Sequence, residues 1–242
     1  MKIVGIIPAR YSSSRFPGKP LVDLKGKTMI QRVYEGAIKS KKLSEVIVAT
    51  DDQRIFDEVT RFGGQVQMTS ANHTTGTDRC GEVATNIEAD IILNIQGDEP
   101  LVDYRQLDGL CAAFEDDNVG IATLAIKGLS KEERNNANRI KIVLDKNGDA
   151  MYFSRSPIPN SDNAKTEMID EFNFYRHIGL YAYRKETLME LVNLDKTLLE
   201  QVESLEQLRW LYNGYAIRVV ETEIETPNID VPEDLEKVLS AL

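Results

Sequence analysis

Three cations occupy one short loop near the N-terminus that contains no acidic residue. Arg10, Arg15 and Lys19 lie in the stretch "IIPARYSSSRFPGKPL", residues 6–21, of a 242-residue chain whose formal net charge is −10. The stretch begins as an apolar run typical of a buried strand, so the cations follow a strand end. Cationic side chains and exposed amides, with Gly18 among them, are the groups that bind a polyphosphate. The loop therefore predicts a polyphosphate site, and a solvated basic loop without a function is the alternative.

The same loop lacks the two commonest nucleotide-binding signatures. A Walker A loop requires a Lys followed by Ser or Thr, whereas Lys19 is followed by Pro20. A G-x-G-x-x-G fingerprint is also absent, which disfavours a dinucleotide cofactor.

Two acidic motifs could bind a metal ion. "NIQGDEP", residues 94–100, places Asp98 just beyond a predicted buried strand, and "NIDVPEDL", residues 228–235, places Asp230 before a helix opened by proline. Carboxylates are the ligands that Mg²⁺ prefers. A surface turn explains Asp98 about as well as a metal site does, and an acidic helix-cap region is the preferred explanation of Asp230 taken in isolation.

Composition excludes several other functions. A pI near 4.9 argues against general nucleic-acid binding, which needs a basic surface. Cys80, Cys111, His73 and His177 are the only cysteines and histidines, too few and too scattered for a zinc site, and the two thiols favour a reduced cytoplasmic location. The apolar runs are too short for a signal peptide or a membrane span, so we expect a soluble protein.

Residues 1–126 alternate between β-rich runs and amphipathic helical patterns. Such alternation predicts right-handed βαβ units, and nearly continuous Val/Ile runs are typical of strands covered on both faces. We expect an α/β fold with a doubly wound, mainly parallel, Rossmann-like sheet. The predicted strands lie at 2–9, 45–51, 64–70 and 90–96, and the predicted helices at 29–41, 53–62, 77–88 and 104–114.

The pattern changes after residue 127. Residues 139–154 are two β-runs joined by Asn-Gly, a strong hairpin signal, and Pro157 and Pro159 then exclude regular structure. The polar segment 160–173 resembles a loop or arm. Further predicted elements are a strand at 176–184, a helix at 204–214 closed by Gly214 and a last helix at 232–242. We expect one domain, 1–242, in which residues 127–183 elaborate the sheet.

The predicted topology brings distant residues together. Ligands of open parallel sheets bind beyond the carboxyl ends of the strands, so the loops starting at Arg10, Asp51, Thr69 and Gln96 should gather at one edge. His177 and Tyr181 should point to the same face of their strand. A lone histidine in such a run is also compatible with a simple core position. Glu206 and Gln207 lie in a leucine-rich helix, and the pattern leaves open whether they face a pocket or solvent.

The motifs together resemble one enzyme family. "IPARYSSSRFPGKPL", "ATDD", "GTDR", "NIQGDEP", "DAMYFSRSPIP", "RHIGLYAYR", "SLEQLR" and "DVPEDL" occur in the order found in CMP-Kdo synthetases, the 3-deoxy-manno-octulosonate cytidylyltransferases. The resemblance extends from Ile3 to Leu239. It implies a nucleotidyltransferase-type fold and transfer of CMP from CTP to the sugar acid Kdo, with release of pyrophosphate and with Mg²⁺ as cofactor. It also implies a homodimer, and residues 127–183 would take part both in dimerisation and in sugar binding.

The resemblance also implies roles for individual residues. Arg10, Lys19 and Asp98 would be catalytic, Asp98 and Asp230 would hold the metal, and Arg155 would be a fork for the sugar carboxylate. The implied nucleotide-binding residues are Pro8, Ala9, Arg10, Ser13, Arg15, Lys19, Ser70, Gly76 and Thr77. The implied sugar-binding residues are Gln96, Arg155, His177, Tyr181, Glu206 and Gln207. The chain departs from the family pattern at Arg139, where a small or apolar residue is usual, at Val231, where Thr is common, and in a long segment at 167–174.

Two other functions remain open at this level. One is cytidylyl transfer to another sugar acid, such as 8-amino Kdo or a sialic-acid-like compound. The other is a non-catalytic protein that binds a nucleotide, although Lys19, Asp98 and Asp230 occurring together weigh against it.

Overall fold

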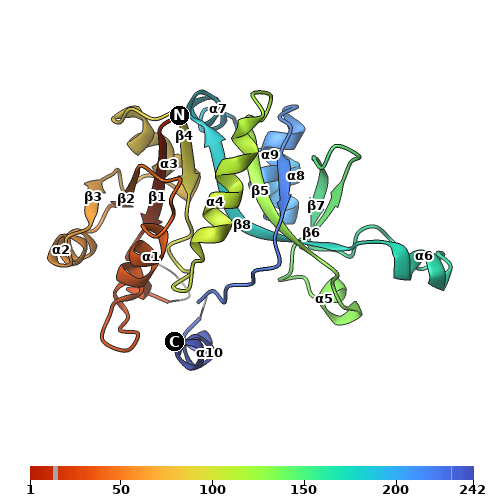
Figure 1. Cartoon of the computed structure of the whole chain (residues 1–242), viewed down its shortest axis with the longest axis horizontal. Coiled ribbons are helices and arrows are strands. Elements are labelled where there is room, and N and C mark those ends of the chain that lie inside the picture. Colours follow the sequence, from red (N-terminus) through yellow and green to blue (C-terminus); the bar gives the residue numbers. More distant parts are fainter. Residues whose placement is uncertain (13–15, 230) are drawn as a thin grey trace.

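The computed structural model describes residues 1–12, 16–229 and 231–242, and it has one large sheet with helices on both faces (Figure 1). The strands of the described residues are β1 Ile3–Ala9, β2 Glu45–Thr50, β3 Gln65–Met68, β4 Ile91–Asn94, β5 Ile121–Lys127, β6 Lys141–Leu144, β7 Ala150–Ser154, β8 Tyr175–Arg184 and β9 Arg218–Glu221. The α-helices are α1 Met29–Ala37, α2 Gln53–Arg61, α3 Gly76–Thr85, α4 Tyr104–Ala112, α5 Lys131–Asn135, α6 Thr166–Glu171, α7 Lys185–Leu191, α8 Leu198–Glu203, α9 Gln207–Tyr212 and α10 Asp234–Ala241. Two 3₁₀ turns are η1 Lys19–Leu21 and η2 Ala113–Glu115.

The sheet has the order β3-β2-β1-β4-β8-β5-β9. The pairs β2–β3, β1–β2, β1–β4 and β5–β9 are parallel, whereas β8 runs antiparallel to both β4 and β5. The predicted doubly wound, mainly parallel sheet is therefore confirmed, with one reversed strand near its middle. This reversed strand corrects one expectation, because β8 belongs to the central sheet and not to the elaboration proposed for residues 127–183.

Apolar side chains alternate between two cores, one on each face of the sheet. Along β1, Ile3 and Ile7 pack into one core with α1, α2 and α4, whereas Val4 and Ile6 pack into the other with α3, α7 and α9. Burial on both faces explains the continuous Val/Ile runs of the sequence. The arrangement leaves the carboxyl ends of β1, β2, β3 and β4 together at one edge.

Local signals set most helix boundaries. Asp52 caps α2 by accepting from the amide of Arg54, and Thr75 and Asp78 form a capping box at α3. The predicted single helix at 204–214 is wrong at its start. Ser204 is the left-handed cap that ends α8, with φ +52°, and α9 begins only at Gln207.

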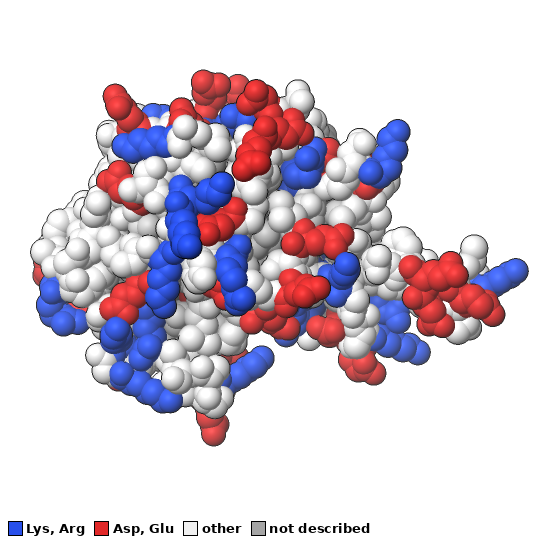
Figure 2. Space-filling model, viewed as in Figure 1, with Lys and Arg blue, Asp and Glu red and all other residues white. Residues whose placement is uncertain are grey.

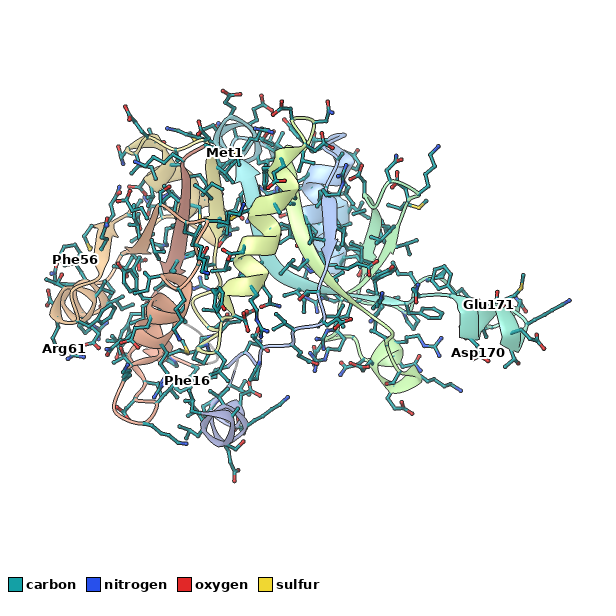
Figure 3. The ribbon with its side chains drawn as sticks, viewed as in Figure 1. Met1, Phe16, Phe56, Arg61, Asp170 and Glu171 are labelled. Carbon is teal, nitrogen blue, oxygen red and sulfur yellow. The ribbon has the colours of Figure 1, made fainter. Side chains whose placement is uncertain are left out.

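The hairpin is confirmed, and the arm is more structured than expected. β6 and β7 pair antiparallel across a turn in which Gly148 has φ +82°. The polar segment that follows contains α6, which projects from the body at the opposite end from α2 (Figure 1). Figure 3 places the labelled Asp170 and Glu171 on this projection, and Figure 2 shows acidic side chains gathered there.

The C-terminal helix packs beside the N-terminal part of the chain. Val238 of α10 and Ile229 form a small core with Leu24 and Met29, and Figure 1 shows α10 below the end of α1. This contact brings the segment around 229 to the loop that carries Lys19. Among the described residues, no helix has the length and apolar character needed to cross a bilayer.

Candidate active site

A cavity of about 230 Å³ opens at the carboxyl ends of β1 and β4. Its described lining residues are Pro8, Ala9, Arg10, Lys19, Pro20, His73, Thr74, Thr75, Gly76, Arg79, Gln96, Gly97 and Asp98. Segments separated by up to ninety residues of sequence therefore meet at one sheet edge, as predicted from the strand pattern. We call this space the first cavity.

Lys19 is a cation held in place in the first cavity by two contacts. It begins η1 directly after Gly18, whose φ of +72° suits glycine and whose amide donates to Tyr11 O at 2.9 Å. Lys19 Nζ donates to Asp98 Oδ2 at 2.9 Å and to the carbonyl of Ile229 at 2.6 Å, and its side chain is 13% exposed. The ammonium is thus held where a phosphate in the cavity would meet it.

Arg10 supplies a second cation to the first cavity. It is exposed at the end of β1 and lines the first cavity, and none of the described residues holds its guanidinium in a hydrogen bond or ion pair. A guanidinium without a partner among the described residues, beside a fixed ammonium, is well suited to an anionic ligand.

The structure adds residues that the sequence argument did not assign. Arg79 is buried, pairs with Asp51 at 3.1 Å and donates to the hydroxyl of Thr69, and it forms part of the cavity wall. Gly97 packs so closely on β1 that an added Cβ would lie 2.6 Å from the carbonyl oxygen of Pro8. Arg79 stands three positions after Gly76 in "GTDR", a spacing that places both on one helix face and could have revealed it.

Asp98 is the described carboxylate best placed for a metal ion. One of its oxygens pairs with Lys19, and its carbonyl accepts from the amide of Ile229 at 2.9 Å. Among the described residues no three His, Cys, Asp or Glu side chains form a metal-binding group. Mg²⁺ commonly needs only one or two carboxylates together with substrate phosphates, so the donor chemistry at Asp98 fits this ion.

A second cavity, of about 260 Å³, shares Gln96 and Asp98 with the first. Its other described lining residues are Glu99, Asn138, Arg139, Ile140, Arg176, His177, Ile178, Gly179, Thr226 and Asn228. Gln96 Nε2 donates to the carbonyl of Gly179 at 2.8 Å, which ties the end of β4 to β8. The two cavities therefore meet at one polar wall.

His177 lines the second cavity and is held as a neutral imidazole. Its Nε2 lies 2.9 Å from the hydroxyl of Thr123, which itself donates to Leu180 O at 2.8 Å, so Nε2 carries the proton. The ring packs against Phe153 and Tyr181 at centroid distances of 5.1 and 5.3 Å. Burial lowers the pKa of His177 from 6.5 to about 3. The contact with Tyr181 confirms that both side chains share one face of β8.

We expect stability to fall as the pH drops from about 6.5 toward about 3, because unfolding lets His177 take up a proton that the native state excludes. The loss should be smaller in His177→Gln, which has no titrating ring. Unfolding in urea at a series of pH values measures this, and identical pH slopes in both proteins would contradict it.

Three predicted sugar-binding residues lie in the buried layer beside β8. Tyr181 packs edge-on against Trp210 at 5.1 Å, and its hydroxyl has no hydrogen-bond partner among the described residues. Glu206 accepts from the hydroxyl of Thr77 at 2.7 Å, and burial raises its pKa. Gln207 is buried at the start of α9. Neither Thr77 nor any of these three residues is among the described lining residues of the two cavities.

Two further predicted residues are engaged elsewhere, and three cannot be placed. Arg155 directs its guanidinium to the carbonyls of Glu203, Ala137 and Ser204, away from the lining of either cavity. Ser70 is exposed after β3, and its amide donates to Glu82. Ser13, Arg15 and Asp230 lie outside the described residues.

Comparison with known proteins identifies the family. The cytidylyltransferase family model matches residues 4–223. The 3-deoxy-manno-octulosonate cytidylyltransferase of Geobacter metallireducens is 49% identical, with 100% of this chain and 98% of the relative covered. That of Parabacteroides distasonis is 53% identical with the same coverage.

Solved structures agree with this assignment. A CMP:2-keto-3-deoxy-manno-octonic acid synthetase complexed with CTP has a TM-score of 0.94 and 44% identity, with 100% of this chain and 98% of that chain covered. A 4-diphosphocytidyl-2C-methyl-D-erythritol synthase from Anaerococcus prevotii, at a TM-score of 0.64 and 16% identity, shares the fold. The two acidic motifs and the cationic loop thus occur in a chain that belongs to the cytidylyltransferase family, among its 3-deoxy-manno-octulosonate cytidylyltransferases.

Proposed function

We propose that the protein transfers CMP from CTP to the anomeric 2-hydroxyl of Kdo and releases pyrophosphate. The observation that carries this proposal is the pair of cavities that share Asp98 and Gln96, with Lys19 bound to Asp98 at their junction. One cavity offers cations for a triphosphate, and the other offers a polar wall for a sugar acid. Relatives about half identical over their full length carry the corresponding name.

The reaction places its reacting atoms at the shared wall. The sugar hydroxyl attacks the α-phosphorus of CTP, the new C2–O–P bond forms, and the bond from this phosphorus to the bridging oxygen breaks as pyrophosphate leaves with the electron pair. The hydroxyl proton is released to solvent. Phosphoryl-type transfer depends mainly on alignment and charge neutralisation. Lys19 and Arg10 would neutralise the triphosphate, and Gln96 would help to align the sugar.

Asp98 and Asp230 are the residues that we propose to hold Mg²⁺. Ile229, which directly precedes Asp230, hydrogen-bonds through its backbone to both Asp98 and Lys19. When bound, the ion would polarise the phosphate and favour ionisation of the attacking hydroxyl.

A homodimer and a cytoplasmic location complete the proposal. Leu198 and Val202 on α8 are 80% and 83% exposed, and Met168 and Phe172 of the projecting arm are also exposed, so apolar side chains are available for a second copy. Light scattering coupled to size-exclusion chromatography tests the dimer. Cys80 and Cys111 are free and buried, in keeping with a reducing compartment.

Pyrophosphate release over a matrix of nucleotides and sugar acids tests the function. We expect release with CTP, Kdo and Mg²⁺ together and none when any one is omitted. A preference for 8-amino Kdo or a sialic-acid-like compound would show that the enzyme's substrate is a sugar acid other than Kdo. CTP binding without pyrophosphate release under every condition would instead indicate a non-catalytic nucleotide-binding protein.

We expect His177→Ala to raise the KM for Kdo at least tenfold and to leave the KM for CTP within about twofold, because the lost ring lines only the second cavity. Initial rates with each substrate varied in turn measure the split. Asn147→Ala, at the exposed hairpin turn, is a control for general effects. Equal changes in both KM values would indicate that His177 has a purely structural role.

A further inference from the structure

The aromatic ring of Tyr11 lies against the glycine that precedes Lys19. The amide of Gly18 donates to the carbonyl of Tyr11 at 2.9 Å, so the chain returns to Tyr11 just before η1 begins. A Cβ added to Gly18 would lie 3.0 Å from Tyr11 Cζ and 3.1 Å from its Cε2 and hydroxyl oxygen, closer than Cβ atoms usually come to a neighbour. Only glycine therefore lets the ring and this backbone meet without displacement. The contact sets the position from which the Lys19 side chain starts.

An arginine from a different element covers the same ring. Cζ of Arg54 lies 3.2 Å from the centroid of the Tyr11 ring, which is a cation–π contact. Arg54 is in the first turn of α2, and its Nε and Nη2 donate to the two carboxylate oxygens of Asp52 at 2.9 and 2.7 Å. Two parallel hydrogen bonds of this kind fix the plane of a guanidinium. The Arg54 side chain is 58% exposed, but its orientation over the ring is held by Asp52.

The acidic motif "ATDD" at the end of β2 thus supports two arginines. Asp51 pairs with Arg79 in the wall of the first cavity. Asp52 pairs with Arg54 over the Tyr11 ring. Capping of α2 explains why Asp52 accepts from the amide of Arg54, but it explains neither the pairing with the guanidinium nor the stacking of that guanidinium on an aromatic ring. The second acid of the motif therefore has a task beyond the helix cap.

These contacts fix the backbone end of Lys19, whereas other contacts fix its ammonium. Nζ of Lys19 is held by Asp98 and by the carbonyl of Ile229. Its backbone follows Gly18, which rests on Tyr11, and Tyr11 in turn packs against the core that contains residues of β1 and α2. A cation held at both ends is preorganised, because little conformational freedom remains to be lost when an anion binds.

We propose that Tyr11 positions Lys19 for the triphosphate, and that Arg54, oriented by Asp52, keeps the Tyr11 ring in place. This inference rests on the proposed function, in which the cationic loop binds the triphosphate of CTP. Tyr11 acts through Gly18 and not through a contact of its own with the substrate, so it is a positioning residue. Arg54 acts through the ring, because its charge is already paired with Asp52.

The test measures kcat/KM for CTP by pyrophosphate release, and the dissociation constant of inorganic tripolyphosphate with Mg²⁺ by titration calorimetry. We expect Tyr11→Ala to lower kcat/KM for CTP about 10- to 100-fold, the range expected when a group is displaced by about 1 Å. The same variant should bind tripolyphosphate about tenfold more weakly and keep the KM for Kdo within about twofold of wild type. Tyr11→Phe should recover most of the loss, since it keeps the ring. Arg54→Ala should lower kcat/KM for CTP about two- to fivefold.

Double variants show whether these residues act through Lys19. Tyr11→Ala should cost little in a Lys19→Ala background, and Arg54→Ala should cost little in a Tyr11→Ala background, because each would remove support for a group that is already lost. Arg61→Ala is the matched control for Arg54→Ala. Arg61 is on the same helix, has a side chain that is 63% exposed and pairs with Glu58 (Figure 3).

Several results would overturn the inference. Wild-type kinetics and tripolyphosphate affinity in Tyr11→Ala would do so, as would losses that multiply when Tyr11→Ala and Lys19→Ala are combined. An Arg54→Ala loss that persists without the Tyr11 ring would show that Arg54 binds the phosphates directly. Tyr11→Leu repeats the comparison with an apolar side chain if the alanine variant fails to fold. A wild-type enzyme that binds tripolyphosphate but does not turn over Kdo refutes the proposed function, and the binding measurements still test the role of Tyr11.

Discussion

Replacing Lys19 by alanine is expected to lower kcat/KM for CTP by roughly a hundred- to a thousandfold, the range found when a preorganised charge at a reacting phosphate or oxyanion is removed. Lys19 is the cation that the structure fixes at the junction of the two cavities, through Asp98 and the carbonyl of Ile229. Pyrophosphate release with CTP varied at saturating sugar acid measures the loss.

Stability should change little in the same variant. The Lys19 ion pair is partly exposed, so its removal should cost about 1 kcal/mol or less of unfolding free energy. Lys27→Ala is the matched control, because Lys27 also pairs with a carboxylate, Glu35, but on the surface of α1. Near-normal turnover in Lys19→Ala would show that the basic loop has no catalytic role.

Asp98→Asn and Asp230→Asn are each expected to lose most activity at low Mg²⁺, and the double variant is expected to be little worse than either. Two carboxylates that hold one ion act as a unit, so removing the second costs little after the first is gone. The measurement is turnover against Mg²⁺ concentration for all four proteins of the cycle, with Mn²⁺ binding followed by electron paramagnetic resonance as an independent readout.

Asp234→Asn controls for the charge change near Asp230. Its side chain accepts from the amide of Val231 at 3.0 Å, so it is a structural acid in the same segment. Losses that multiply in the double variant, or an Asp230→Asn protein with full activity and full Mn²⁺ binding, would contradict the shared metal and leave Asp230 as part of a helix-cap region.

The order of elements could be predicted from the sequence because local patterns determine it. Continuous Val/Ile runs mark strands buried on both faces, and cap residues such as Asp52 mark where helices begin. The reversed direction of β8 could not be predicted, because strand direction is fixed by which neighbours a strand meets and not by its own residues. The break at Ser204 was missed for a related reason, since an αL cap made by a non-glycine residue has no strong sequence signature.

The candidate site also contains some residues that could be predicted from the sequence and others that could not. The cationic loop and "QGDEP" could be assigned because each follows a strand end, and the parallel topology places such ends together. Arg155 was assigned as the sugar-carboxylate fork from resemblance, whereas the structure uses its guanidinium on three backbone carbonyls. Nothing in the sequence distinguishes an arginine with free donors from one whose donors are used, so the contacts of the Arg155 guanidinium could be known only from the structure.

The most direct test of the central claim is a nuclear magnetic resonance measurement of the product made from Kdo labelled with ¹³C at C2. The account predicts that, with CTP and Mg²⁺, the C2 signal acquires coupling to one phosphorus while pyrophosphate is released in equal amount. That result requires a bond between the anomeric oxygen and the α-phosphorus, the step assigned to the wall that the two cavities share at Asp98. Pyrophosphate release without phosphorus coupling at C2 would contradict the account.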